Sequence, residues 1–164
     1  MKISNILVGV LFISLLISCS SKKHHPEPAP YIYPDTNRFV LPYSYPYMNG
    51  YAKFWYPNSY ILISEGNYEN GQPSGYWKFY YPDGRLLREG NYANGFLSGY
   101  WKFYYPDGKM QEEGNYENNM KSGYWKYYYP AGFKSSEGNY VNGTKQGEWK
   151  IYNGDGSLAS IINY

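Results

Sequence analysis

The residues of this 164-residue chain with the most potential for covalent or metal chemistry lie near its N-terminus. Cys19 is the single cysteine, and His24 and His25 are the two histidines. A thiol can be acylated, can bind a metal or can form a disulfide, but a lone cysteine has no partner within its own chain for a disulfide. The two adjacent histidines could hold a metal ion weakly. Because they stand beside Lys22 and Lys23, we interpret them as solvated linker residues, and we predict no metal site.

The sequence before Cys19 favours acylation. Lys2 gives a basic start, and residues 6–17 form an apolar run of twelve, which suits a signal-peptide core and is shorter than the roughly 20 residues of a membrane-spanning helix. The run ends in Leu16-Ile17-Ser18-Cys19, which resembles the bacterial lipobox. The resemblance implies that residues 1–18 are a lipoprotein signal peptide that is removed, and that Cys19 carries covalent lipid such as palmitate. An ordinary signal peptide with an incidental cysteine is the weaker alternative.

The lipid would fix the location of the protein. Each buried CH₂ contributes about 0.8 kcal/mol of membrane affinity, so two or three acyl chains anchor a protein stably. Retention in the inner membrane usually requires Asp after the lipidated cysteine, and Ser20 stands there. We therefore expect a membrane-anchored protein of the bacterial outer membrane, on its periplasmic or surface side. Residues 19–47 follow as a lipid-anchored tether rich in proline and tyrosine, which should be extended and semi-rigid.

Beyond the tether the chain repeats with a period of 24 residues. The sequence Glu-Gly-Asn-Tyr occurs at 65–68, 89–92, 113–116 and 137–140, and one tryptophan and a second glycine recur at the same interval. A degenerate first unit at 48–65, with Ala52 in the tryptophan place, precedes the clear repeats at 66–164. Each unit has a strand, a Pro-Asp-Gly turn, a second strand and an Asn-Gly turn. These units predict an all-β fold, an elongated single-layer antiparallel meander of about ten strands, ~45 Å long at ~4.8 Å per strand.

The repeated charges favour one strand register. If Asp83-Gly84 are the central turn residues, Trp77 faces Gly90 and Lys78 faces Glu89; across the next turn, Glu89 faces Lys102 and Tyr92 faces Gly99. A three-residue Pro-Asp-Gly loop with a bulge would shift the pairing by one and set Lys78 against Arg88. Opposite-charge pairs contribute roughly 0.2–1 kcal/mol each and like charges cost a similar amount, so we predict the first register and an alternating Lys/Glu ladder.

That register divides the aromatic residues between the two faces of the sheet, both of which should be partly wet. One face carries the ladder with Tyr76, Tyr100 and Tyr124. The other carries a candidate binding or packing surface: Trp77, Trp101, Trp125, Trp149, Tyr68, Tyr92, Tyr116 and Tyr140. These rings could be stacking platforms for a ligand. Packing on neighbours and on the glycines is the more conservative interpretation for any single tryptophan.

The motif Gly66-x-Tyr68-x-Asn70-Gly71-x-x-x-Gly75-x-Trp77-x-x-Tyr80 resembles the MORN repeat (membrane occupation and recognition nexus), and more closely its bacterial variant. The resemblance covers 66–164, with Asn119, Gly154 and Ile162 as departures from the pattern. It implies an elongated sheet used as a binding or assembly scaffold. Some bacterial variants carry a YwqK-family antitoxin label, which implies toxin neutralisation as one further possibility.

The composition of the repeats argues against an enzyme and against nucleic acid as a partner. Residues 64–164 contain no histidine or cysteine, and their ten basic and eleven acidic residues are interspersed, so neither a Cys-His or Ser-His-Asp site nor a basic stripe can form. The repeated glutamates fit a ladder better than a catalytic pair. We expect a non-catalytic protein-interaction or structural scaffold of the envelope, with no cofactor beyond the lipid. The alternatives are binding of a glycan or lipid headgroup, and neutralisation of a toxin as an antitoxin or immunity-type protein.

The last strand differs from its equivalents. Residues 157–164 have Ile161 in place of the ladder glutamate and Ile162 in place of the glycine. Edge strands usually carry charge or proline that prevents pairing with other chains. We therefore expect this edge to be covered, by the same strand of a second copy in a homodimer or, in competition with it, by the tether.

Overall fold

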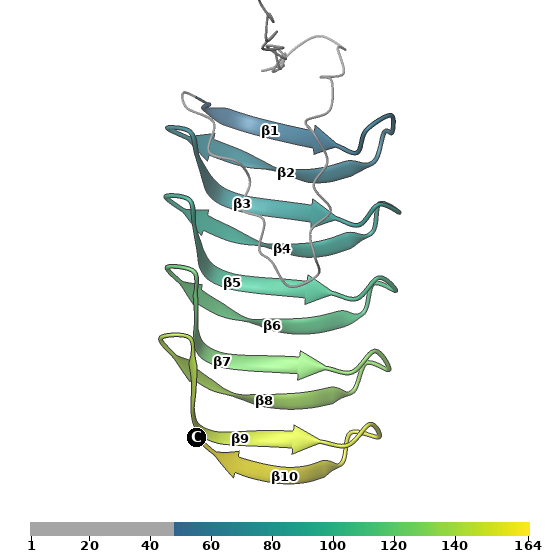
Figure 1. Cartoon of the computed structure of the whole chain (residues 1–164), viewed down its shortest axis with the longest axis vertical. Coiled ribbons are helices and arrows are strands. Elements are labelled where there is room, and N and C mark those ends of the chain that lie inside the picture. Colours follow the sequence, from purple (N-terminus) through teal and green to yellow (C-terminus); the bar gives the residue numbers. More distant parts are fainter. Residues whose placement is uncertain (1–47) are drawn as a thin grey trace, which may run out of the picture.

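The computed structural model describes residues 48–164 as one ten-stranded antiparallel sheet in which strand order follows chain order (Figure 1). The predicted signal peptide, Cys19 and the predicted tether lie outside the described residues. The strands are β1 (Gly50–Trp55), β2 (Leu62–Glu69), β3 (Gln72–Tyr80), β4 (Leu86–Ala93), β5 (Phe96–Tyr104), β6 (Met110–Glu117), β7 (Met120–Tyr128), β8 (Lys134–Val141), β9 (Thr144–Tyr152) and β10 (Leu158–Asn163). The predicted all-β meander is confirmed. The described part of the chain holds no helix able to cross a membrane.

The Asn-Gly turns lie at one end of the hairpins and stack on one another. Asn94 has φ 50° and Gly95 φ 80°, the two positive angles that a type I′ turn requires. Asn119, which replaces the glycine in one turn, has φ 67°, a left-handed conformation that asparagine tolerates better than most residues. The Gly95 amide also donates to the Pro73 carbonyl at 3.0 Å, and the Asn119 amide donates to that of Leu97 at 3.1 Å. Each turn is thereby bonded to the previous hairpin.

The Pro-Asp-Gly turns differ from the expected two-residue geometry. The Tyr81 amide donates to the Arg85 carbonyl at 2.8 Å, and the Gly84 amide donates to the Tyr81 carbonyl at 2.9 Å, so three residues form the loop. Such a loop alone would shift the register by one. A bulge at Leu87 shifts it back, since Tyr80 faces Leu86 whereas Phe79 faces Arg88. The predicted pairing of Lys78 with Glu89 is therefore confirmed, through two irregularities that cancel.

A second bulge lies where each hairpin joins the next. Between β4 and β5, Glu89 faces Lys102 as predicted, but Asn91 faces Ser98, which leaves two extra residues on β5. Tyr92 consequently faces Leu97, and the predicted pairing with Gly99 is wrong. Gly99 lies inside the bulge at φ 67°, a left-handed conformation that glycine adopts at little cost.

The core is a single layer of rings on one side of the sheet, here called the indole face and defined by Trp77, Trp101, Trp125 and Trp149. These four side chains are 0% exposed, so the expectation that both faces are partly wet does not hold at the tryptophans. Edge-to-face contacts link the rings into a row, with centroids 5.1 Å apart for Tyr68–Trp77, 6.0 Å for Trp77–Tyr92 and 5.2 Å for Tyr92–Trp101. The row continues to Tyr164 at the last strand. Neighbouring rings thus supply the burial that a second layer supplies in most folds.

Candidate functional site

Each tryptophan closes the bulge beside it. The bulge between β4 and β5 interrupts the backbone ladder next to Asn91, and the indole nitrogen of Trp101 donates to the Asn91 carbonyl at 3.0 Å. The other three tryptophans bond the asparagine ten residues earlier at 3.0–3.1 Å. A carbonyl that the bulge removes from the ladder therefore keeps a donor, as buried backbone groups require.

The glycine of Glu-Gly-Asn-Tyr makes room for the indole. A Cβ built on Gly90 would lie 2.2 Å from Cδ2 of Trp101, and the corresponding distance at Gly66, Gly114 and Gly138 is 2.2–2.4 Å, each to the tryptophan of the following strand. Of the rings on the two flanking strands, the tryptophan on the following strand lies closest to each glycine. The nearest ring atoms to Gly114 belong to Trp125, because the bulge tilts each indole back toward the preceding hairpin.

The other candidate residues of the indole face are also enclosed. Tyr68, Tyr92 and Tyr116 are 1–4% exposed, and Tyr140 is half-buried against the same core. A ligand could stack on these rings only after displacing their neighbours. The structure therefore places these residues in the packed layer, and their binding role remains a prediction.

A charged network interrupts the indole face in the third unit. Lys121 Nζ donates to Glu112 Oε2 at 2.7 Å and to the Tyr127 hydroxyl at 2.8 Å, and that hydroxyl lies 2.9 Å from the Tyr140 hydroxyl. The ammonium group also lies 4.1 Å from the Trp125 ring centroid, a cation–π contact. Burial lowers the pKa of Lys121, and the charge of Glu112 opposes that change. The ammonium group and the carboxylate satisfy each other, so the network does not present either of them freely to a ligand.

Sequence reasoning missed this network, although a signal was present. The position four residues before the tryptophan holds Pro73 and Leu97 in the first two clear units, then Lys121 and Lys145. The change from apolar to basic at a repeated position marks the place where the units stop being equivalent. Lys145 lies over its own tryptophan in the same way, with Nζ 4.2 Å from the Trp149 ring centroid.

The opposite side of the sheet is here called the tyrosine–lysine face. It is defined by the exposed tyrosines, the lysines and the glutamates that recur in register: Tyr51, Tyr76, Tyr100, Tyr124, Lys53, Lys78, Lys102, Lys126, Lys150, Glu65, Glu89, Glu113 and Glu137. Each glutamate accepts hydrogen bonds from two tyrosines. Glu65, for example, accepts from Tyr51 at 2.8 Å and from Tyr80 at 2.6 Å.

The same clamp repeats along the sheet. Glu89 accepts from Tyr104 at 2.7 Å and from Tyr76, and Glu113 accepts from Tyr128 at 2.7 Å and from Tyr100. The predicted Lys/Glu register is right, but the tyrosine hydroxyls make the shorter contacts. Lys53–Glu65 is an ion pair at 3.3 Å and Lys126–Glu113 one at 3.8 Å. Cross-strand charge is therefore a secondary contribution to this face.

The clamp sets the protonation of both partners. Burial alone would raise the pKa of Glu65, Glu113 and Glu137, but the donated hydroxyls and the nearby ammonium groups outweigh it, and the pKa of each carboxyl lies below its usual value. Burial, together with the hydrogen bond to a carboxylate, raises the pKa of Tyr76 and of Tyr100 to about 12. At neutral pH the carboxylates are ionised and the phenols remain donors.

The clamp also decides which groups the face presents to solvent. The Glu65, Glu113 and Glu137 side chains are 8–15% exposed, whereas those of the lysines Lys53, Lys126 and Lys150 are 41–44% exposed. The rings of Tyr51, Tyr76, Tyr100 and Tyr124 are 44–52% exposed. An approaching molecule therefore meets phenol rings and ammonium groups over most of this face, together with the exposed carboxylates of Glu69, Glu117 and Glu148.

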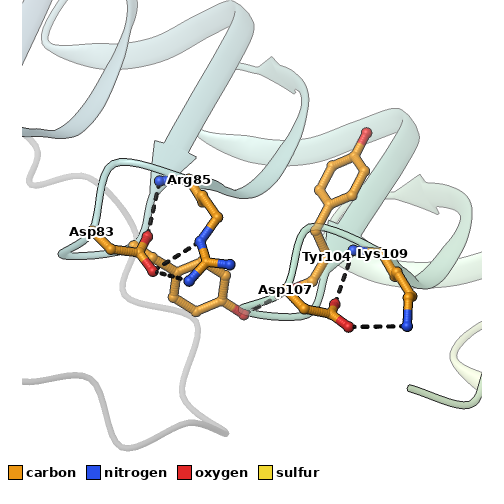
Figure 2. A network of polar contacts seen from close by, with 6 residues as sticks. Asp83, Arg85, Tyr104, Asp107 and Lys109 are labelled. Carbon is orange, nitrogen blue, oxygen red and sulfur yellow. Dashed lines mark hydrogen bonds and ion pairs between the residues drawn. The ribbon is translucent and has the colours of Figure 1, made fainter. Parts of the chain in front are cut away.

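The acidic residues of the Pro-Asp-Gly turns are used within the turns (Figure 2). Asp83 accepts from the Arg85 amide at 3.0 Å and from its guanidinium at 2.6 Å, and Asp107 bonds the Lys109 amide at 3.0 Å in the same way. Between these turns, the Tyr81 hydroxyl donates to the Tyr104 carbonyl at 2.7 Å. These contacts stabilise the loop edge. Residues 48–164 bring together no group of three side chains suited to a metal ion.

Comparison with known proteins matches three stretches of the chain, 73–94, 97–118 and 145–164, to the family described as the MORN repeat variant. No curated protein matches the chain. The intervening stretch shares the geometry of the matched ones, since Trp125 faces Gly138 and lies over Gly114. The repeated unit is therefore continuous through the sheet.

Proposed function

We propose that this chain of MORN-variant repeats is a non-catalytic scaffold, held on a bacterial envelope membrane by lipid on Cys19, that binds a partner along its sheet. Repeats of this family suggest a binding or structural role. The observation that carries the proposal is the recurrence of the same exposed groups in successive units of the tyrosine–lysine face. Equivalent sites on one rigid body bind a repetitive partner more tightly than any single site does.

The state of the carboxylates supports a non-catalytic role. The repeated glutamates accept from two hydroxyls each, and those with a shifted pKa are held ionised. A general acid needs the opposite change, a pKa raised toward the working pH. Glu112, which occurs in only one unit, is paired with Lys121.

The exposed aromatic rings favour the tyrosine–lysine face over the indole face as the contact surface. Glycan or headgroup binding through Trp77 or Trp101 would need an accessible indole, and both are fully buried. Tyr76 and Tyr100 offer nearly half of their surface instead. Toxin neutralisation would be one case of protein binding at this surface.

We further propose that β10 pairs with β10 of a second copy. Leu158, Ile161 and Ile162 are 41–52% exposed on a strand that has one neighbouring strand among residues 48–164. Tyr164 and Gly147 exchange both backbone hydrogen bonds. Because alternate residues of an antiparallel strand point their backbone groups to the same side, the amides of Ile161 and Asn163 point away from β9 and toward the open edge. If the two β10 strands pair antiparallel with Ile161 of one copy opposite Ile161 of the other, they form a dimer with two-fold symmetry. The unpaired backbone groups of β10 are then bonded at this end of the sheet.

Capture of partners by the intact lipoprotein tests the scaffold proposal. The tagged protein is cross-linked in cells and purified from envelope extracts, beside a variant with Lys78→Glu and Lys102→Glu on the tyrosine–lysine face. Arg85→Gln, at an exposed turn, is the matched control. We expect an envelope component that the control retains and the double variant loses. Equal recovery with both variants would contradict binding through this face, and absence of any specific component would contradict the scaffold.

A further inference from the structure

The last turn of the sheet, which joins β9 to β10 (Figure 1), differs from its equivalents at two neighbouring positions. Where earlier units have tyrosine and proline, as in Tyr81-Pro82, this turn has Asn153-Gly154. Its backbone bonds are unchanged, since the Asn153 amide donates to the Ser157 carbonyl at 2.8 Å and the Gly156 amide donates to the Asn153 carbonyl at 2.9 Å. The two changes therefore keep the turn and place an asparagine directly before a glycine.

We propose that Asn153 is a site of self-modification, at which the backbone nitrogen of Gly154 converts the side-chain amide to a carboxylate. The nitrogen gives up its proton and attacks Cγ of Asn153, the new N–Cγ bond closes a five-membered imide, and the Cγ–Nδ2 bond breaks with release of ammonia. Water then opens the imide. Attack at Cγ gives aspartate, and attack at the main-chain carbonyl gives isoaspartate, in which the chain continues through Cβ and Cγ. The sum is one water consumed and one ammonia released, with no change of oxidation state.

The state of the attacking nitrogen separates Asn153 from the asparagines of the Asn-Gly turns. The Gly95 amide donates to the Pro73 carbonyl at 3.0 Å, and the amides of Gly71 and Gly143 each donate to a backbone carbonyl at 2.9 Å. Such a nitrogen must leave its carbonyl before it can lose a proton and reach the side chain. Among residues 48–164, the Gly154 amide donates to no backbone carbonyl, so its nitrogen needs no such opening.

The other turns of the same kind cannot react in this way. Pro82, Pro106 and Pro130 stand where Gly154 stands, and proline has no N–H to lose. The tyrosine before each proline also has no carbonyl carbon in its side chain. Both reacting groups therefore occur together in the last turn alone among these four turns.

The surroundings of Asn153 leave it free to react. Residues 153–157 are exposed, so water reaches the imide. A Cβ at Gly154 would meet no atom within 4 Å, and glycine adds no side chain of its own that would hinder the approach to Cγ. The Asn153 amide nitrogen donates to the Ser157 hydroxyl at 3.0 Å, an exposed bond that water can replace when the side chain rotates.

The modification changes the turn that holds β10. In isoaspartate the carbonyl that accepts from Gly156 becomes a free carboxylate, and the main chain between the Asn153 amide and Ser157 gains one carbon. Neither turn bond then keeps its geometry. Because β10 pairs only with β9 among residues 48–164, a weakened turn frees this edge strand from the sheet more often.

Peptide mass spectrometry of the purified protein, aged in mildly alkaline buffer with detergent micelles, tests the site. The acid form is measured at Asn153 and, as the internal control, at Asn94. Isoaspartate is distinguished from aspartate by enzymatic methylation. We expect Asn153 to react about tenfold or more faster than Asn94, because one hydrogen bond of the Gly95 amide must first be broken and ~1.4 kcal/mol is a factor of ten in rate.

Two variants identify the attacking nitrogen. Gly154→Pro restores the residue of the other turns and removes the N–H, so the reaction at Asn153 should stop while that at Asn94 is unchanged. Gly154→Ala keeps the N–H and adds a methyl group that hinders attack, so it should react several-fold more slowly than the wild type. Urea midpoints show whether either variant is folded, and the alanine variant keeps the test valid if the proline variant is not.

Hydrogen exchange measures the effect on β10. Amides of residues 158–163 should lose protection in aged wild-type protein and keep it in Gly154→Pro aged in parallel. Equal rates at Asn153 and Asn94, a wild-type rate in the folded proline variant or in the alanine variant, or unchanged protection of β10 in molecules with isoaspartate at position 153 would each overturn the inference.

Discussion

The fit between glycine and indole can be tested by adding one methyl group. In Gly90→Ala the new Cβ would lie 2.2–2.5 Å from Cδ2, Cε2 and Cγ of Trp101, whereas carbon atoms in good contact are ~3.5–4.0 Å apart. The ring would have to move by ~1 Å or more. Tyr92 and Phe103 surround it, with centroids at 5.2 and 6.1 Å, and the movement would strain its 3.0 Å hydrogen bond to Asn91.

The magnitude follows from these two losses. Overpacking a dense core typically costs about 1–3 kcal/mol, and loss of one hydrogen bond costs about 0.5–1.5 kcal/mol. We expect Gly90→Ala to lower the free energy of unfolding by about 2–4 kcal/mol, seen as a lower urea midpoint with an unchanged slope. Gly154→Ala is the matched control, because a Cβ there meets no atom within 4 Å and its φ is not positive.

A double-mutant cycle identifies the cause. Trp101→Ala alone should cost about 3–5 kcal/mol through the cavity that it leaves. If the methyl group acts by displacing the indole, Gly90→Ala should cost much less in the Trp101→Ala background, and the two losses will not add. A Gly90→Ala midpoint equal to that of Gly154→Ala, or strict additivity, would refute the account of the indole face given above.

Three further predictions concern the anchor, the clamp and the edge strand. Cys19→Ser should abolish incorporation of labelled palmitate and leave an uncleaved precursor or a soluble form; labelling that survives the substitution contradicts lipidation at this residue. Folding lowers the pKa of Glu113. The ionised side chain therefore contributes its full stabilisation above about pH 4.5, the ordinary pKa of a glutamate, and this contribution is lost as the pH falls through the lower pKa of the folded state. Urea midpoints at pH 7 and pH 3 should therefore differ less for Glu113→Gln than for the wild type, and an equal difference would exclude the clamp as a source of acid sensitivity. Ile161→Lys should convert a dimer to a monomer in light scattering of the mature protein, whereas a wild-type protein that is monomeric at high concentration rules the β10 pairing out.

The sequence alone determined the repeat and its consequences for topology. A strict period of 24 residues with two turn signals per unit indicates a hairpin meander, because each unit repeats the same local rules. The pairing of Lys78 with Glu89 could also be predicted from the sequence, because the register that aligns opposite charges recurs in every unit. Asn119 could be accepted as a turn residue because asparagine, like glycine, visits positive φ.

The tertiary structure decided how that register is reached and which face is available. A three-residue turn and a bulge at Leu87 cancel, and no local pattern in Pro-Asp-Gly reveals a compensation several residues away. The bulge at Gly99 tilts Trp101 onto Gly90, so the tryptophans are buried and the exposed rings are tyrosines such as Tyr100. Sequence spacing shows which residues share a face. The solvent exposure of those residues depends on the tilt of each ring and on the hydroxyl–carboxylate contacts between units. Both are set only when the sheet has folded.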